Sequence, residues 1–309
     1  MKVLVVSQDA GGAEIVSSWV RQNSENDYNF LLDGPAKKIF QKKLGDIQNN
    51  ANAGFKQLVE IVDFVLTGTS DSSDLEKEAI LQAKKHSTDS AAFLDYWYGF
   101  RKRFEINGQL TLPDEIWVGD NYAYDLAKQE LPEAVVVLKN NPYLDDILKE
   151  KQVLEKRKKL RNEILHILYL CQPYKQEIRN EKGEQKIITD NLALHYFFEI
   201  LTRNIPIQAE VRLRLHPLES SGKYRELISL FSKEIKISES SGRRLAEDLV
   251  WSDVAVGMHA QALAVAVSFG KKVYHCIPNG GHQCVLPHKE IQDFSAEKLD
   301  HLTFNLKSA

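Results

Sequence analysis

The chain has 309 residues, of which 43% are hydrophobic and 27% charged, and its formal net charge is −3. This length predicts two domains, and the composition is that of an ordinary globular protein. The slightly acidic balance argues against a general nucleic-acid binder, and no apolar run approaches the ~18 residues of a membrane-spanning helix.

Cysteine usage and the N-terminus both indicate a cytoplasmic protein. Cys171, Cys276 and Cys284 show neither CxxC pairing nor metal-finger spacing, which is typical of reduced thiols. The first residues, MKVLVVSQD, predict a core strand rather than a signal peptide, because polar residues follow the short apolar run at once. The basic stretch Lys149–Glu163 predicts a solvated helix face, with contact to an anionic membrane surface or acidic glycan as the alternative. We therefore expect at most peripheral membrane contact, at the inner face.

Strand and helix patterns alternate through the first half of the chain. Pro35 stands at a favourable helix start, and Pro142 ends the last strand of this half. The patterns predict strands at residues 2–7, 29–34, 64–70, 89–97, 115–120 and 134–140, and helices at 13–23, 35–44, 72–86 and 123–131.

The alternation continues in the second half, after the basic helical segment, and we interpret residues 181–184 as a loop. Alternating strands and helices predict parallel sheets with helices on both faces. The expected fold is therefore α/β, with two doubly wound, Rossmann-like domains at residues 1–150 and 151–309 that face each other across a cleft. The patterns of this half predict strands at 163–174, 209–215, 234–238, 254–256 and 272–276, and helices at 191–204, 223–233, 243–251 and about 259–269.

The first strand delivers a candidate general base to its carboxyl end. Asp9 follows this strand and precedes Gly11 and Gly12, which let the backbone turn sharply and approach a ligand. A carboxylate at this position could deprotonate an attacking hydroxyl, and it could equally cap the helix that follows. The glycines do not form the GxGxxG fingerprint, so the sequence does not predict NAD binding.

Later strand ends of the first half form a candidate acceptor site. Asp95, Trp97 and Arg103 lie at or soon after the end of the fourth predicted strand, and residues 67–70 end the third. An aromatic face packs on a sugar ring, while a carboxylate binds its hydroxyl groups. The alternative is that Trp97 belongs to the core.

The strand at residues 209–215 ends in a second group of candidate residues. Alternation places Arg212 and Arg214 on one face of this strand. His216 follows, and Pro217 fixes the turn. Such a histidine can donate to a phosphate or a ribose and, when protonated, can stabilise a departing phosphate. We therefore interpret Arg214, His216 and Pro217 as part of a donor site.

Two further loops of the second half suit a phosphate. Ser240 and Ser241 lie between a strand and a helix, where they can cradle a phosphate or simply cap the helix. Gly257, Met258 and His259 lead into the last predicted helix. The N-terminus of a helix gathers unpaired N–H groups and the positive end of its dipole, so this loop predicts a donor-phosphate site.

Several catalytic signatures are absent from the sequence. There is no GxSxG elbow for a hydrolase triad and no Walker motif for an NTPase. The nine histidines lack HExxH or similar ligand spacing, so we expect neither a metal nor another cofactor.

Short segments in both halves carry a family resemblance. They are RLHPLE with a following Tyr224, SESSG, SDVAVGMHAQALAVAVSFGKKVYHCIP, VSQDAGG, TGTSDSSDLEKEAI, LDYWYGFRKRF, PDEIWVGD and NNPYLDD. Together they resemble glycosyltransferases of the GT-B fold, and more narrowly the bacterial surface-polysaccharide and sialyltransferase-like branches. In that family the His-Pro motif binds the nucleotide and phosphate of a CMP-activated donor, and the serine-rich loop contacts the same phosphate. The resemblance implies these roles for His216, Pro217, Ser240 and Ser241.

The chain departs from this family pattern in three places. Ala260 stands where relatives carry a hydroxyl residue, the acidic motif that supplies the base is absent as such, and the tail after Lys289 is short. We assign Asp9 as the substitute base. We also expect the helix that crosses back to the first domain to be missing or reduced.

The expected function is that of an inverting, metal-independent glycosyltransferase of bacterial glycan synthesis. The first domain would bind a glycan, lipid-linked or protein acceptor, and the second a nucleotide-sugar donor, which by the resemblance is CMP-activated and sialic-acid-like. Such an enzyme works by positioning two substrates and stabilising the leaving charge. The alternatives are a UDP-sugar-dependent transferase, a nucleotide-sugar epimerase or hydrolase of the same fold, or a non-catalytic nucleotide- or sugar-binding protein.

Overall fold

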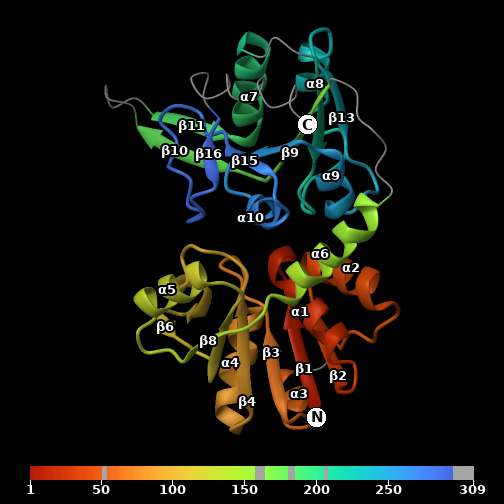
Figure 1. Cartoon of the computed structure of the whole chain (residues 1–309). Helices are drawn as coiled ribbons and strands as arrows, with labels where there is room; N and C mark the ends of the chain where they lie inside the picture. Colours follow the sequence, from red (N-terminus) through yellow and green to blue (C-terminus); the bar gives the residue numbers. More distant parts are fainter. Residues whose placement is uncertain (51–53, 157–163, 180–184, 205–207, 295–309) are drawn as a thin grey trace. The chain divides into compact units, whose positions relative to one another are not determined.

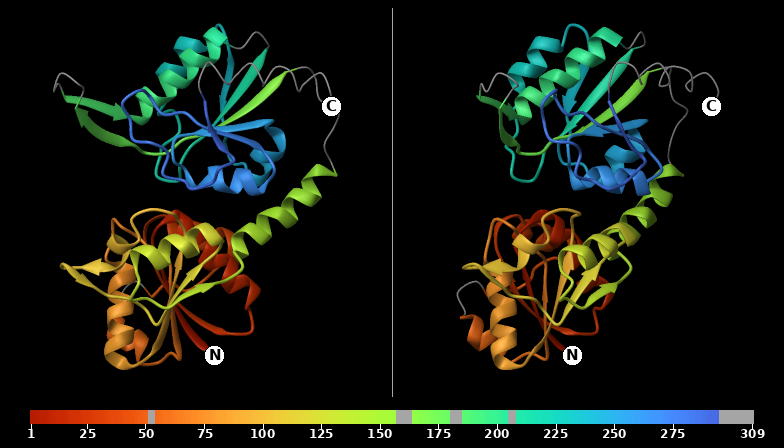
Figure 2. Two further views of the ribbon diagram at one scale, coloured as in Figure 1. Left: turned by 60° about the vertical axis from the view of Figure 1, so that its left-hand side comes forward. Right: turned by 90° about the vertical axis from the view of Figure 1, so that its left-hand side faces the viewer.

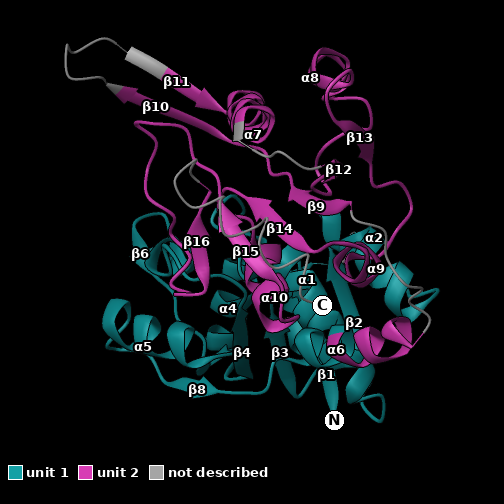
Figure 3. Ribbon diagram, turned by 45° about the horizontal axis from the view of Figure 1, so that its top comes forward, with its two compact units in different colours: residues 1–147 teal, residues 148–309 magenta. Residues whose placement is uncertain are grey.

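The computed structural model describes residues 1–50, 54–156, 164–179, 185–204 and 208–294. The chain forms two compact units, Met1–Ile147 and Leu148–Ala309, which are coloured separately in Figure 3. Each unit is built on a parallel sheet of six strands with helices packed on it (Figure 1), so the predicted α/β class is confirmed. In the described part of the chain, no helix combines the length and apolar character that crossing a bilayer requires.

Unit 1 contains a six-stranded sheet and a small antiparallel pair. Its strands and the short 3-10 helix η1 are β1 Lys2–Ser7, β2 Asp27–Leu32, β3 Phe64–Thr67, β4 Asp89–Leu94, η1 Arg101–Phe104, β5 Glu105–Ile106, β6 Gln109–Leu110, β7 Glu115–Val118 and β8 Val136–Leu138. The sheet has the order β2-β1-β3-β4-β7-β8, and each neighbouring pair is parallel. Strands β5 and β6 form the antiparallel pair.

Helices cover both faces of this sheet. They are α1 Ala10–Gln22, α2 Gly34–Leu44, α3 Phe55–Val59, α4 Leu75–His86, α5 Asn121–Glu130 and α6 Pro142–Glu155. Helices α1 and α2 and the start of α6 pack on one face, whereas α3, α4 and α5 pack on the other.

The residues of β1 show why the sheet is covered on both faces. Val3, Leu4, Val5 and Val6 are all fully buried. The two odd-numbered valines pack in the core with α1 and α2, and Leu4 and Val6 pack in the core with α3 and α4. A continuous run of aliphatic and β-branched residues is typical of a parallel strand that lies between two helical layers.

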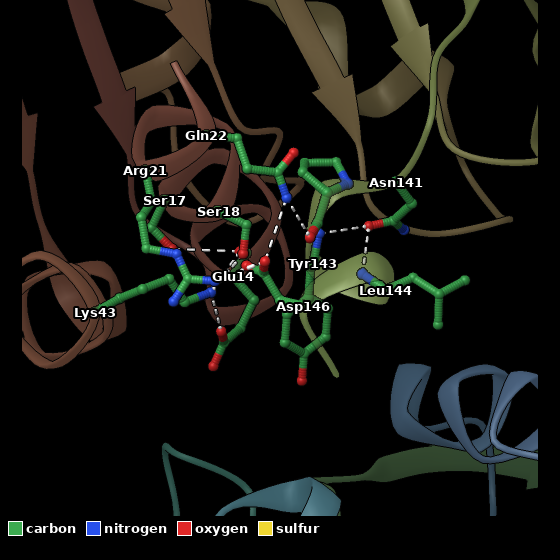
Figure 4. Close-up of polar contacts among 11 residues, drawn as sticks. Glu14, Ser17, Ser18, Arg21, Gln22, Lys43, Asn141, Tyr143, Leu144 and Asp146 are labelled. Carbon is green, nitrogen blue, oxygen red and sulfur yellow. Dashed lines mark hydrogen bonds and ion pairs between the residues drawn. The ribbon is translucent and has the colours of Figure 1, made fainter. Parts of the chain in front are cut away.

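The start of α6 is tied to α1 by the polar network in Figure 4. Asp146 pairs with Arg21 at 2.6 Å and accepts a hydrogen bond from Gln22, whose amide also donates to the backbone carbonyl of Pro142. The side chain of Asn141 caps the helix by accepting from two backbone N–H groups. These contacts explain why the beginning of α6 belongs to unit 1, although the division between the units falls within this helix.

Unit 2 also contains a six-stranded parallel sheet and one antiparallel pair. Its strands are β9 Leu165–Leu170, β10 Lys175–Arg179, β11 Gln185–Thr189, β12 Ala209–Arg214, β13 Lys236–Glu239, β14 Val254–Gly257, β15 Lys272–His275 and β16 Ile291–Asp293. The sheet has the order β13-β12-β9-β14-β15-β16. Strands β10 and β11 form a hairpin that extends beyond the sheet (Figure 2).

Both faces of this second sheet are also covered. Its helices are α7 Asp190–Asn204, α8 Arg225–Phe231, α9 Leu245–Trp251 and α10 Gln261–Ser268. Val211 and Leu213 of β12 pack in the core with α7 and α8. Arg212, between them on the opposite face of the strand, contacts Asp248 of α9. Alternation along β12 therefore separates an apolar face from a face that carries arginines, as predicted.

The structure corrects several predicted elements. The hairpin β10–β11 was not expected, because its strands are short and mostly polar, and β16 was also missed. Strand β4 ends at Leu94 rather than at residue 97, since Asp95 turns into polar contacts with Arg103. Helix α10 begins at Gln261 rather than at residue 259. The loop at 181–184, the end of the basic stretch and the tail after residue 294 lie outside the described residues.

Candidate functional site

Each sheet contains a topological switch point, where the winding of the chain reverses direction. In unit 1 this point lies between β1 and β3, and in unit 2 it lies between β9 and β14. Open α/β sheets bind ligands outside the carboxyl ends of the strands beside such a point. Each unit therefore has its own candidate site.

In unit 1, the loop after β1 places Asp9 at the switch point. Asp9 occupies the N-cap position of α1 in an extended conformation, but its side chain makes no capping hydrogen bond. Gly11 and Gly12 lie in the first turn of α1, and a Cβ on Gly12 would come within 3.2 Å of the Gly68 Cα. The absence of a side chain thus lets the helix start pack on the backbone after β3. The Asp9 side chain therefore does not cap this helix.

Asp95, directly after β4, is held by Arg103 of η1. The Arg103 Nη1 lies 3.0 Å from the Asp95 Oδ1, and it also donates to the carbonyl and hydroxyl oxygens of Thr69. Burial raises the pKa of Asp95, and the Arg103 guanidinium opposes this rise, while the charge of Asp9 adds to it. The structure therefore brings Asp9, Thr69 and Asp95 together from three neighbouring strand ends.

The structure adds a carboxyl group that the sequence did not single out. Glu76, in the first turn of α4, is only 1% exposed, and its Oε1 accepts a hydrogen bond from the backbone N–H of Gln8 at 2.8 Å. Burial, together with smaller contributions from the charges of Asp9 and Asp95, raises the pKa of Glu76 to about 7. Three carboxyl groups thus share this end of the sheet, and one of them titrates near neutral pH.

The indole of Trp97 is bound to Asp120. Its indole Nε1 donates to the carboxylate oxygens of Asp120 at 3.1 and 3.0 Å. Asp120 is the N-cap of α5 and also accepts from the backbone N–H of Ala123. The Trp97 ring packs against the core beneath α5. These are the contacts of a partly buried packing residue.

In unit 2, β14 delivers Gly257, Met258 and His259 to the switch point. A Cβ on Gly257 would lie 2.9 Å from the carbonyl oxygen of Leu170 in β9, so glycine is needed here for close packing. Met258 is buried in a cluster with the hairpin. Helix α10 then begins after Ala260, whose side chain gives no capping hydrogen bond. A helix start without a side-chain cap suits an anionic ligand.

His259 is buried and neutral rather than cationic. It is 5% exposed, its backbone N–H donates to the Gln172 Oε1 at 2.9 Å, and its ring lies 5.4 Å from that of Tyr174. Burial, followed by the neighbouring charges of His275 and His282, lowers the pKa of His259 to about 4. A contact between His259 and an anionic ligand at neutral pH would therefore be a hydrogen bond rather than an ion pair.

The turn at His216 and Pro217 is held by Glu219. The backbone N–H of His216 donates to the Glu219 carboxylate at 2.8 Å, and the His216 Nδ1 accepts from the backbone N–H of Leu218 at 3.2 Å. Glu219 also accepts a 2.6 Å hydrogen bond from the hydroxyl of the buried Tyr224. Because Nδ1 is an acceptor, the neutral imidazole carries its proton on Nε2, which makes Nε2 a hydrogen-bond donor.

Arg214 and Ser240 converge on one buried aspartate. Asp248 of α9 is fully buried and pairs with Arg212 at 3.0 Å and with Arg214 at 2.8 Å. The Ser240 hydroxyl donates to the same carboxylate at 2.5 Å. The Arg212 guanidinium also lies over the Trp251 ring, 3.8 Å from its centroid. Arg214 and Ser240 thus belong to an internal network of unit 2.

The remaining predicted donor residues are exposed, and no metal centre accompanies them in the described chain. Pro217 and Ser241 lie on the surface. Among the described residues, no group of three or more His, Cys, Asp or Glu side chains is arranged to hold a metal ion. The arrangement offers carboxyl groups that can accept protons in unit 1, and neutral hydrogen-bond donors beside a helix start in unit 2.

Sequence reasoning located both strand-end regions but missed four residues that organise them, namely Glu76, Gln172, Glu219 and Asp248. Each of these residues is defined by a contact with a distant or folded segment rather than by a local pattern. A signal existed for Glu219, since an acidic residue three positions after His216 can fold back on the turn. The other three show no comparable local signal.

Solved structures of known proteins share the fold of this chain. No family model matches the chain, and no curated protein matches it by sequence. The UDP-GlcNAc 2-epimerase of Methanocaldococcus jannaschii, crystallised with UDP-GlcNAc and UDP, is similar with a TM-score of 0.61 and 16% identity over 99% of this chain and 93% of that chain.

Two further solved structures extend this likeness. MurG of Acinetobacter baumannii is similar with a TM-score of 0.54 and 12% identity, over 90% of this chain and 79% of that chain. The wall teichoic acid polymerase TagF is similar with a TM-score of 0.55 and 10% identity, over 99% of this chain and 79% of that chain. At such identities the likeness shows the fold, which is that of GT-B proteins. The narrower sialyltransferase-like resemblance is not part of what these neighbours show.

Proposed function

We propose that the protein is a glycosyltransferase that uses a nucleotide-activated sugar, with the acceptor site in unit 1 and the donor site in unit 2. The observation that carries this proposal is the different chemistry of the two switch points. Carboxyl groups gather after β1 and β4, whereas β14 ends in a glycine and is followed by a neutral histidine and a helix start without a side-chain cap. The likeness to MurG and TagF supports a transferase on this fold.

In this mechanism Asp9 is the general base. Its carboxylate accepts the proton of the acceptor hydroxyl while that oxygen attacks the anomeric carbon and the bond to the leaving phosphate breaks, with inversion. The His216 Nε2 and the first N–H groups of α10 would stabilise the negative charge that remains on the phosphate. Asp95, fixed by Arg103, would accept a hydrogen bond from the acceptor sugar.

The first test is replacement of the proposed base. Asp9→Asn should lower the transfer rate by a factor of about 100 to 10,000, which is the usual contribution of a general base, and should leave nucleotide binding intact. Asp33→Asn is the matched control, because Asp33 is also an N-cap without a capping side-chain hydrogen bond. Normal turnover in Asp9→Asn, or an equal loss in Asp33→Asn, would contradict this role.

The identity of the nucleotide is the finer part of the proposal. The segment resemblance favours CMP, whereas the M. jannaschii neighbour was crystallised with UDP-GlcNAc and UDP. A thermal-shift screen against CMP, CDP, UMP, UDP, GDP and dTDP separates these donors. A ligand at a hundredfold excess over its Kd stabilises the folded state by roughly 2.7 kcal/mol.

We expect a shift that His216→Ala abolishes and that His195→Ala, on the partly exposed face of α7, retains. A selective CMP shift supports a CMP-sugar donor, and a UDP shift replaces it by a UDP-sugar donor. The absence of a shift with every nucleotide would contradict a donor site in unit 2.

A second candidate is a nucleotide-sugar epimerase or hydrolase of the same fold. It is favoured by the higher TM-score of the M. jannaschii epimerase, 0.61 against 0.54 for MurG. Incubation of the protein with a nucleotide sugar, in the absence of any acceptor, distinguishes the two functions. Release of free sugar or formation of an epimer supports the second candidate, whereas an unchanged donor that reacts only after acceptor addition supports the transferase.

A further inference from the structure

Glu76 is a buried carboxyl group with no compensating cation in the described structure. Its Oε1 accepts the backbone N–H of Gln8 at 2.8 Å, and its Oε2 is buried without a hydrogen-bond partner among the described residues. The neighbouring lysine of the same helix, Lys77, is directed instead to Asp74 at 2.9 Å. A buried carboxylate that lacks a cation is strongly disfavoured relative to the neutral acid.

The groups that face Glu76 from adjoining elements also oppose its ionisation. Asp9 from the loop after β1 and Asp95 from the end of β4 both add negative charge. The residues at the end of β3 and directly after it, 67–70, are Thr, Gly, Thr and Ser, and Glu105 at the start of β5 is exposed. Arg103, a cation at this cluster, is bound to Asp95 at 3.0 Å. Geometry and charge therefore both favour a neutral Glu76, in agreement with its pKa of about 7.

We propose that Glu76 is a positioning residue for Asp9, which holds the loop after β1 in place while it is protonated and releases this loop when it ionises. The catalytic consequence rests on the proposed function, in which Asp9 is the base. Glu76 can act on Asp9 through the backbone, because Gln8, which donates its N–H to Glu76, immediately precedes Asp9 in the chain.

Protonated Glu76 can accept this hydrogen bond without adding a third negative charge to the cluster. Ionised Glu76 would place an uncompensated carboxylate in a buried site beside Asp9 and Asp95, and hydrating it would require the loop to open. Opening moves Gln8 and Asp9 away from the switch point, so transfer should fall as the pH rises above about 7.

The direct test needs no substrate. In protein labelled with ¹³C at the glutamate side-chain carboxyl carbons, wild type should show one carboxyl resonance that titrates near pH 7, and Glu76→Gln should lack that resonance. The backbone amide resonance of Gln8 should move with the same midpoint. If every glutamate titrates in the ordinary acidic range, the proposal is overturned.

The catalytic test compares two replacements with a control. Glu76→Ala should lower kcat about tenfold or more, because the loop that carries Asp9 loses its anchor. Glu76→Gln, which retains an acceptor oxygen and has no charge, should restore most of kcat and remove the decline on the alkaline side. Glu78→Gln, on the same helix but partly exposed and paired with Gln82, should behave as wild type.

The two tests separate two kinds of failure. If the resonance near pH 7 and the Gln8 response are present but no variant changes transfer, the proposed role of Asp9 fails while the buried protonated carboxyl stands. If Glu76→Gln keeps the alkaline decline in an active enzyme, Glu76 is not its cause and the positioning role is refuted.

Discussion

Asp248 is fully buried, where it pairs with two arginines and accepts a hydrogen bond from a serine that follows the neighbouring strand. Removing a charged group from water costs several kcal/mol unless its partners compensate. Here Arg212 and Arg214 supply that compensation from one face of β12. A phosphate that bound Arg214 directly would compete with this pairing. We therefore infer that Arg214 and Ser240 mainly stabilise the loops of the proposed donor site, rather than bind the phosphate themselves.

Removal of the Asp248 carboxylate should therefore destabilise unit 2. Asp248→Ala leaves two arginines without their buried partner, and we expect a loss of about 3–5 kcal/mol in the free energy of unfolding, measured by urea denaturation. Asp293→Ala, whose side chain is about half exposed, is the control and should change stability by less than about 1 kcal/mol. A similar small effect in both variants would show that the network contributes little.

Predictability from sequence also differs between residues. Asp9, Asp95 and His216 could be proposed from the sequence because each lies within two residues of the end of a strand, and strand ends meet at one edge of a parallel sheet. Glu76 was missed because an acidic residue in the first turn of a helix is usually a solvated partner of the helix dipole. Only the folded chain shows that this position is buried.

The hairpin β10–β11 shows that a whole secondary-structure element can also escape prediction from sequence. Its two strands alternate weakly, but Ile188 is fully buried with Ala193 and Met258, while its neighbour Ile187 is 44% exposed. The long apolar strands of the two sheets, in contrast, could be predicted because burial on both faces demands continuous aliphatic runs. A short strand that buries a single side chain carries too little pattern to be recognised.

Truncation of the two isoleucines tests how the hairpin is anchored. Ile188→Ala should lower the stability of unit 2 by about 2–4 kcal/mol, because it leaves a cavity against Met258 at the switch point. Ile187→Ala removes the same number of atoms from the outer face and should cost less than about 1 kcal/mol. Thermal unfolding of both variants checks this prediction. Equal losses of stability would show that Ile188 is not the residue that anchors the hairpin.

At the scale of the whole molecule, the two units have opposite responses to pH. The pKa of Glu76 in unit 1 is raised to about 7, so its contribution to stability is complete below the ordinary value of 4.5 and is lost as the pH rises through about 7. The pKa of His259 in unit 2 is lowered to about 4, so its contribution is complete above 6.5 and is lost as the pH falls towards 4.

Each of these two pKa shifts changes the free energy of unfolding by roughly 3 kcal/mol at most. Hydrogen exchange measured by mass spectrometry can follow the units separately. We expect protection of unit 1 to decrease on the alkaline side and to be retained by Glu76→Gln, and protection of unit 2 to decrease on the acidic side and to be retained by His259→Gln. The opposite assignment of the two responses would contradict the burial of these groups.

The overall architecture was the most predictable property of the chain. Strand and helix alternation led to two α/β units with parallel sheets, and the two strand orders then fix which strand ends can meet. The residues that steady those ends, such as Gln172 beside His259 and Glu219 beside His216, could not be predicted, because each depends on the three-dimensional course of a loop.

The stacking of Arg212 on Trp251 has a practical consequence for spectroscopy. The chain has four tryptophans, and three of them, Trp19, Trp97 and Trp117, belong to unit 1. Trp251 in unit 2 is covered by the Arg212 guanidinium and lies 4.8 Å from the His166 ring. With the other three replaced by phenylalanine, the remaining indole would be a single fluorophore whose emission reports the integrity of the β12–α9 contact.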